Sequence, residues 1–174
     1  MTDRDELPGV PLVLAGPSGG GKTSVCGELL ERRDDVVFSV SATTRAPRPY
    51  ETDGRHYRFV DRGRFDEMID SDELLEWAEV HGELYGTPRD QLDACLEDGY
   101  TLLLDVDVQG ARDIRRRVPD AVLVFVLPPG ADSMLERLHR RGSEDEGELR
   151  RRMRTALAEL DAVGGFDYAV VNRD

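Results

Sequence analysis

The sequence predicts a three-layer α/β fold in which helices cover both faces of a mostly parallel sheet, with a small lobe of mixed or antiparallel strands inserted into it. Three observations predict this fold. Apolar runs alternate with amphipathic helical segments towards both ends of the 174-residue chain. A glycine-rich loop joins the first apolar run directly to the first helix. Between about residues 41 and 88 the pattern changes to short, polar segments that contain aromatic residues.

Each element is justified by its own pattern. Residues 10–15, VPLVLA, form an apolar run typical of a buried strand, and the helix after the loop places Val25, Cys26, Leu29 and Leu30 on one face. In the helix that follows the lobe, we expect Thr87 as N-cap, Pro88 at the first position and Gly99 as terminator. The expected strands are 10–15, 35–40, 56–60, 74–82, 83–86, 100–107, 121–128 and 167–171, and the expected helices 23–33, 61–71, 86–99, 109–117, 132–142 and 146–164.

Composition and charge exclude several classes of protein. No apolar run is long enough to span a bilayer, and the N-terminal residues do not form a secretory signal, so we expect a cytoplasmic protein. The two cysteines have no CxxC or histidine partner, which argues against a disulfide framework or a zinc site. The formal net charge of −13 argues against a nucleic-acid partner, although clustered arginines can still bind small anions.

The glycine-rich loop carries the strongest chemical signal. Residues 16–23, GPSGGGKT, satisfy the pattern GxxxxGK[ST] between a strand and a helix, which predicts a phosphate-binding loop (P-loop) for a nucleoside triphosphate. Its glycines let successive backbone N–H groups turn towards the phosphates, next to the positive end of the helix. The predicted ATP-binding residues of this loop are Gly16, Pro17, Ser18, Gly19, Gly20, Gly21, Lys22, Thr23 and Ser24.

Lys22 is the one lysine in a chain whose other cationic side chains are arginines. A compact ammonium can reach the β and γ oxygens across a crowded loop, whereas a planar guanidinium needs more width. We therefore expect Lys22 to be catalytic. Thr23 and Asp105, at the end of the LLLD strand, are the expected Mg²⁺ ligands, Asp105 through water.

A loop of this kind is shared by switch GTPases, motor ATPases and small kinases, so the remaining residues must decide between them. Ser41, Arg45, Arg48 and Tyr57 lie in the inserted lobe, and forked arginines with a phenol suit a second phosphate. The sequence lacks the NKxD pattern of guanine-binding GTPases. These features favour a kinase with a small phosphorylated acceptor.

From about residue 10 to its end, the sequence closely resembles the guanylate kinase family. The resemblance rests on several motifs at once: GPSGGGKT, SVSATTRAPRP, HYRFV, EWAEVHGELYGT, LLLDVDVQGA and FDYAVVN. It implies a single P-loop kinase domain over residues 1–174, with a core (1–40, 88–136 and 153–174), a GMP-binding lobe (41–87) and a helical lid (137–152). It also implies Mg²⁺-dependent transfer of a phosphoryl group from ATP to GMP, and acceptance of dGMP, in purine nucleotide metabolism.

The resemblance assigns roles to individual residues. It implies that Arg45, Arg48, Tyr57 and Tyr85 hold the phosphate of GMP, and that Ser41, Glu76, Thr87 and Asp107 recognise guanine. It further implies that Arg137, Arg141 and Arg152 of the lid are catalytic along with Arg45 and Arg48, and that Asn172 lies near the adenine of ATP. The final VNRD carries Arg173 where the family usually has an aspartate, and the family usually continues into a further helix.

Chemistry supports the guanine assignment independently. Guanine offers N1–H and an exocyclic amine as adjacent donors, which the carboxylates of Glu76 and Asp107 can accept, whereas adenine presents a bare N1 acceptor. A general base is unnecessary, because the attacking atom is a phosphate oxygen that is already largely deprotonated at neutral pH. Two alternatives remain: a non-catalytic module of this fold that binds phosphopeptides, and a P-loop kinase for another small phosphorylated acceptor. The sequence leaves the oligomeric state open.

Overall fold

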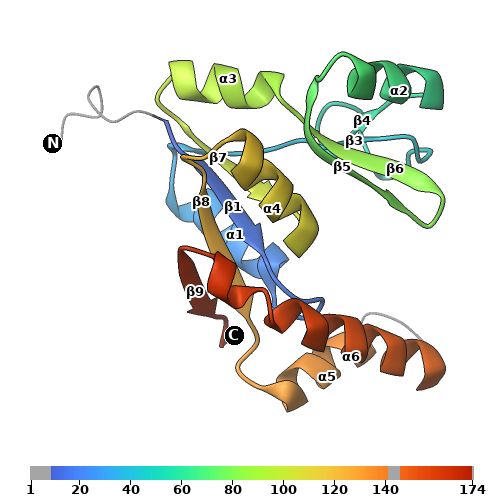
Figure 1. The fold of residues 1–174 in the computed structure, drawn as a ribbon, viewed down its shortest axis with the longest axis vertical. Helices are drawn as coiled ribbons and strands as arrows, with labels where there is room; N and C mark the ends of the chain where they lie inside the picture. Colours follow the sequence, from blue (N-terminus) through green and yellow to red (C-terminus); the bar gives the residue numbers. More distant parts are fainter. Residues whose placement is uncertain (1–8, 141–145, 174) are drawn as a thin grey trace, which may run out of the picture.

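The computed structural model describes residues 9–140 and 146–173 of the chain. Its central sheet has the strand order β2-β7-β1-β8-β9, and every neighbouring pair in it is parallel. The predicted parallel α/β core is therefore confirmed (Figure 1). These strands are β1 (Pro11–Ala15), β2 (Val36–Phe38), β7 (Thr101–Asp105), β8 (Val122–Leu127) and β9 (Tyr168–Val171).

Helices pack on both faces of this sheet because β1 is apolar on both sides. Leu14 packs with Cys26 of α1 (Lys22–Arg32) on one face. Val13 and Ala15 point to the other face and share a cluster with Ile114 of α4. Alternate residues of β1 thus pack against the helices on opposite faces of the sheet. On this second face lie α3 (Asp90–Glu97) and α4 (Val108–Arg117).

A second sheet, of order β4-β3-β6-β5, forms the inserted lobe. Its sheet is mixed, because β3 pairs in parallel with β4 but antiparallel with β6, which in turn pairs antiparallel with β5. His81 and Gly82 join β5 to β6 with φ values of 54° and 85°, the positive angles of a two-residue hairpin turn. The lobe consists of β3 (Ala42–Thr43), β4 (Arg58–Phe59), α2 (Arg62–Asp70), β5 (Leu74–Val80) and β6 (Glu83–Pro88).

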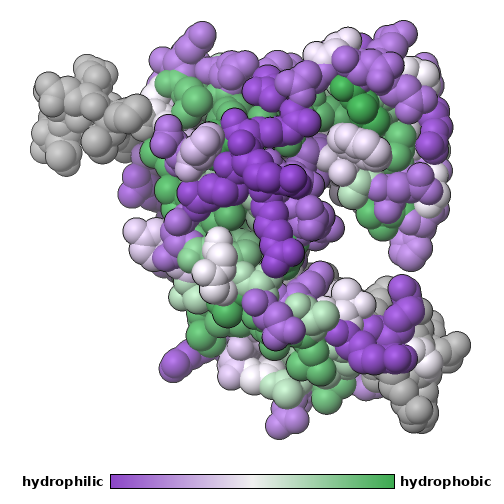
Figure 2. All heavy atoms as spheres, in the orientation of Figure 1, coloured by the Kyte–Doolittle hydropathy of each residue, from purple (hydrophilic) through white to green (hydrophobic). Residues whose placement is uncertain are grey.

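Two further helices lie at the other end of the core from the lobe (Figure 1). They are α5 (Ala131–Arg140) and α6 (Glu146–Leu160), and Met134 packs against Ala156 where they meet. A 3₁₀ helix (Val163–Gly165) leads from α6 into β9. Figure 2 shows an open cleft between the lobe and α6. None of the helices within the described ranges combines the length and apolarity that crossing a membrane requires.

The prediction that Thr87 and Pro88 begin the helix after the lobe is wrong. Both residues belong to β6, and α3 begins at Asp90 with Arg89 as its N-cap. The hydroxyl of Thr87 donates to Glu76 of β5 instead, so a partner on the neighbouring strand outweighs the local capping pattern. Gly99 does end the helix, with a φ of 73°.

Candidate active site

The glycine loop, residues 16–23, runs from the end of β1 into the first turn of α1. Gly21 is the N-cap of α1 and has a φ of 91°, a conformation that glycine adopts without strain. A Cβ on Gly16 would lie 2.4 Å from the carbonyl oxygen of Val126, so the loop also packs too closely on β8 for a side chain there. The turn therefore depends on glycine at both ends.

Lys22 curls back over this loop. Its Nζ donates a hydrogen bond of 2.7 Å to the carbonyl oxygen of Gly16. The loop borders a cavity of about 370 Å³, which is also lined by Asp105, Asp107 and Glu159. The predicted triphosphate site is thus a cavity lined by the glycine loop and by the ammonium group of Lys22.

The predicted metal ligands fit Mg²⁺ in kind and in place. Asp105 ends β7 beside Leu14 of β1, and both Asp105 and Thr23 border the cavity of the glycine loop. Carboxylate and hydroxyl oxygens suit this ion, which usually keeps several waters and takes further oxygens from substrate phosphates. In the described ranges no three His, Cys, Asp or Glu side chains come together as a metal cage.

Side chains from the C-terminal part of the chain tie down the glycine loop. Asn172 Nδ2 donates to the carbonyl oxygen of Gly21 over 3.3 Å. Arg137 Nη1 donates to the carbonyl oxygens of Gly19 and Gly20, and its Nη2 to that of Asn172, all at 3.3 Å. The loop, α5 and the end of β9 therefore meet at one point.

A second cationic site lies in the lobe. The guanidinium of Arg45 lies 5.4 Å from the ring centroid of Tyr57, and Tyr57 packs edge-on against Tyr85 with centroids 6.0 Å apart. Burial raises the pKa of the Tyr57 hydroxyl, so it stays a neutral hydrogen-bond donor. Arg48 is exposed beside them, and its Nη1 donates to the hydroxyl of Tyr50 over 3.1 Å. These groups can together bind a phosphate.

A carboxylate pair lies where the lobe meets the core. Thr87 Oγ1 donates to Glu76 Oε1 over 2.6 Å, while Asp107 caps α4 by accepting from the Gly110 amide over 2.7 Å. A Cβ on Gly110 would lie 3.1 Å from Glu76 Oε2 and 3.4 Å from Asp107 Oδ1. Burial raises the pKa of Glu76 to about 7, against the Thr87 hydrogen bond, and the negative charge of Asp107 raises it further. The two carboxylates therefore lie close enough beside Gly110 to repel each other electrostatically.

Comparison with known proteins identifies the family of this chain. The family model described as guanylate kinase matches residues 9–174. The chain belongs to the guanylate kinase family. A guanylate kinase of Rhodococcus jostii is 51% identical over 165 residues, which cover 94% of this chain and 80% of that protein. One of Desulfitobacterium hafniense is 46% identical over 164 residues, covering 94% and 82%. The crystal structure of guanylate kinase from Anaplasma phagocytophilum superposes with a TM-score of 0.75 at 35% identity, over 99% of this chain and 81% of that one.

Most of the residues expected from the guanylate kinase resemblance lie at the glycine loop, beside Arg45 in the lobe, or at the carboxylate pair. Their roles stay predictions. Ser41 is half-buried just before β3, where its carbonyl oxygen accepts from the Arg58 amide. Arg141 lies outside the described residues, and Arg152 is on α6 with an undescribed side chain. Arg137, on α5, donates from its guanidinium to backbone carbonyl oxygens of the glycine loop.

Two carboxylates beside the predicted site residues were missed by the sequence analysis. Glu159 of α6 borders the cavity of the glycine loop, and its Oε2 is buried without a hydrogen-bond partner in the described structure. Burial raises the pKa of Glu159, which the positive charge of Lys22 opposes. Glu51 forms an ion pair with Arg45 inside the lobe. Neither residue could be picked out from its local sequence, because each lies in a segment rich in charged residues. Their burial comes from contacts that form only when the chain has folded.

Proposed function

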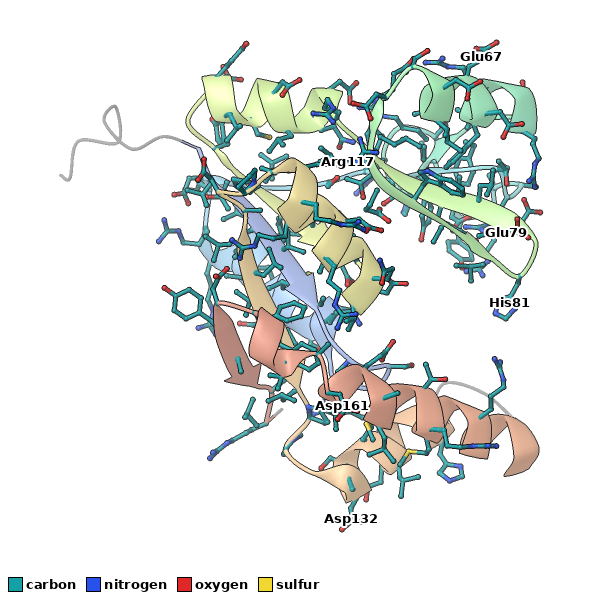
Figure 3. All side chains as sticks on the ribbon, in the orientation of Figure 1. Glu67, Glu79, His81, Arg117, Asp132 and Asp161 are labelled. Carbon is teal, nitrogen blue, oxygen red and sulfur yellow. The ribbon has the colours of Figure 1, made fainter. Side chains whose placement is uncertain are left out.

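We propose that this protein transfers the γ-phosphoryl group of MgATP to GMP, giving ADP and GDP. One observation supports the proposal: two groups of side chains of the types that bind phosphates stand on different parts of the fold, one on the core and one on the lobe. The glycine loop with Lys22 lies on the core, and Arg45 with its two tyrosines lies on the lobe. Figure 3 shows His81 at the hairpin end of the lobe, pointing to the side on which α6 lies.

The glycine loop serves as the donor site for ATP. Backbone N–H groups and the positive end of α1 bind the β- and γ-phosphates. Lys22 leaves the Gly16 carbonyl oxygen and reaches the transferred phosphoryl group, where its charge is needed in the transition state. Thr23 and Asp105 would hold Mg²⁺, which would supply further charge neutralisation when bound.

The lobe serves as the acceptor site. Arg45, Arg48, Tyr57 and Tyr85 hold the phosphate of GMP, and one of its oxygens attacks the γ-phosphorus in line. This oxygen needs no general base, since a phosphomonoester loses its second proton near pH 6. The work of the protein is to align two polyanions and exclude water, which arginines of the lid, Arg137 among them, complete.

Selection of guanine falls to the carboxylate pair. Glu76 and Asp107 accept from the N1–H and exocyclic amine of the base, and Ser41 and Thr87 are assigned as further contacts of the base. An adenine base would leave a buried carboxylate facing a lone pair, and unpaired polar groups of this kind can discriminate by about 10⁴-fold. The roles assigned to these residues concern the base and the phosphate, so we expect dGMP to be accepted too. We also propose a cytoplasmic location, where Cys26 and Cys95 stay reduced.

An ADP-release assay with MgATP and a panel of acceptors tests the proposal. GMP and dGMP should stimulate ADP formation, while AMP, CMP and UMP should leave it at the background rate. A phosphopeptide-binding module would release no ADP with any acceptor, and a kinase for another substrate would ignore GMP. Either result would reject the assignment.

A further inference from the structure

Glu51 is a buried anion inside the phosphate-binding part of the lobe. Its side chain is 5% exposed and that of Arg45 is 19% exposed. Arg45 Nη2 donates to Glu51 Oε1, and Nη1 donates to Oε2, both over 2.9 Å. This two-bond fork is the strongest geometry available to an arginine and a carboxylate.

The same carboxylate also holds the backbone at Arg48. The amide of Arg48 donates to Glu51 Oε2 over 2.7 Å, and the amide of Glu51 donates back to the Arg48 carbonyl oxygen over 2.9 Å. One carboxylate therefore connects both arginines, the first through its guanidinium and the second through its main chain. A small shift of Glu51 would move both.

The remaining contacts of Arg45 define the plane of its guanidinium. Nη1 gives its other hydrogen to the Ala46 carbonyl oxygen over 2.8 Å. The guanidinium carbon lies 5.4 Å and 5.8 Å from the ring centroids of Tyr57 and Phe59. After the fork to Glu51, Nε and one Nη2 hydrogen remain, and this side of the guanidinium also hydrogen-bonds with Tyr85. The guanidinium is therefore held between Glu51 and the two tyrosines.

We propose that Glu51 is a positioning residue for the phosphate of GMP, holding the Arg45 guanidinium and the Arg48 backbone in the geometry that the phosphate requires. This rests on the proposed function, in which these arginines bind that phosphate. The hydrogen bonds from Arg45 and Arg48 also lower the pKa of Glu51 to about 2, so it stays an anion at any working pH.

The alternative is that Glu51 occupies Arg45 in place of the phosphate and leaves when GMP arrives. The burial of Glu51 and its bond to the Arg48 amide argue against this, because leaving would open the turn that presents Arg48. The two roles predict opposite effects. Removing a negative charge beside a phosphate site should tighten GMP binding by Coulomb's law, whereas loss of a positioning group should weaken it.

Binding of GMP and of guanosine to Glu51→Gln, measured by calorimetry, separates these roles. Guanosine lacks the phosphate and so reports on the base site alone. We expect GMP to bind about tenfold more weakly, equivalent to about 1.4 kcal/mol, with guanosine binding unchanged. In turnover, KM for GMP should rise while KM for ATP stays the same. Glu79→Gln, an exposed change on β5, is the matched control and should bind GMP like the wild type.

Glu51→Asp provides a second variant if Glu51→Gln does not fold, as judged by circular dichroism. It keeps the charge but is one methylene too short for its present contacts, so GMP binding should again weaken without loss of guanosine binding. Equal or tighter GMP binding in either folded variant would overturn the proposal, and so would parallel weakening of GMP and guanosine. Failure of the wild type to bind or phosphorylate GMP would instead reject the proposed function.

Discussion

Lys22 gives the most direct prediction at the scale of a residue. Its Nζ is 2.7 Å from the Gly16 carbonyl oxygen and needs only to turn to meet a phosphate. Lys22→Met should lower kcat by about 10²- to 10³-fold, because a charge that stabilises the transition state is lost. Lys22→Arg should not restore the rate, since the planar guanidinium is too wide for the loop. The coupled assay measures both, with thermal melting as the control for folding; a Met variant of unchanged kcat would contradict this role.

Glu76 predicts a dependence of stability on pH. Burial raises its pKa in the folded protein to about 7, above the usual 4.5, so the folded state binds the proton more tightly than the unfolded state. The free energy of unfolding attributable to Glu76 therefore falls as pH rises from about 4.5 to about 7 and is constant above that. Glu76→Gln should become more stable relative to the wild type across this range, in thermal melts without nucleotide. A difference in melting temperature independent of pH would contradict the burial of this carboxyl group.

The same substitution should impair GMP more than ATP. Glutamine keeps the shape of Glu76 but replaces one acceptor by a donor, so kcat/KM for GMP should fall roughly 10- to 100-fold while KM for ATP is unchanged. Glu97→Gln on α3, an exposed change, is the matched control. Equal losses for both nucleotides would remove Glu76 from the base site.

At the scale of elements, α2 supports the lobe that we propose as the acceptor site. Phe65 is fully buried and packs with Met68, Leu74 and Leu84 beneath the second sheet. Phe65→Ala should lower the free energy of unfolding by about 3–5 kcal/mol, measured by urea unfolding. It should also raise KM for GMP more than KM for ATP, because the cavity left by the lost side chain lies in the lobe. Leu104→Ala, on β7 in the central sheet, is the comparison. Phe65→Ala would contradict this division if it changed both KM values equally.

Elements with a local pattern could be predicted from sequence, whereas contacts between distant segments could not. The strand, loop and helix from residue 10 to residue 33 follow from one apolar run, a glycine pattern and a helical face. Thr87 and Pro88 imitate a helix start, but pairing with β5 decides their conformation. Glu51 stands among exposed polar residues, and its burial against Arg45 and the aromatic rings arises only when the lobe has folded. Glu159 meets the glycine loop through the packing of α6.

At the scale of the whole molecule, the cleft between the lobe and α6 is open to solvent (Figure 2). Water in this cleft could compete with GMP for the γ-phosphoryl group. Direct transfer therefore requires the lobe and the α5–α6 side to approach each other when both nucleotides are bound, and we expect the predicted lid arginines to complete the site. A protein that places two polyanions end to end in this way should transfer phosphate between them and rarely to water.

Following the terminal phosphate of ATP tests this claim most directly. With ATP labelled in its γ-phosphate, Mg²⁺ and GMP, the label should appear in GDP in equal amount to the ADP formed, with almost none as inorganic phosphate. Without GMP, ATP should remain nearly intact. Label that accumulates as inorganic phosphate while GMP stays unphosphorylated would contradict direct transfer between two nucleotides in the cleft.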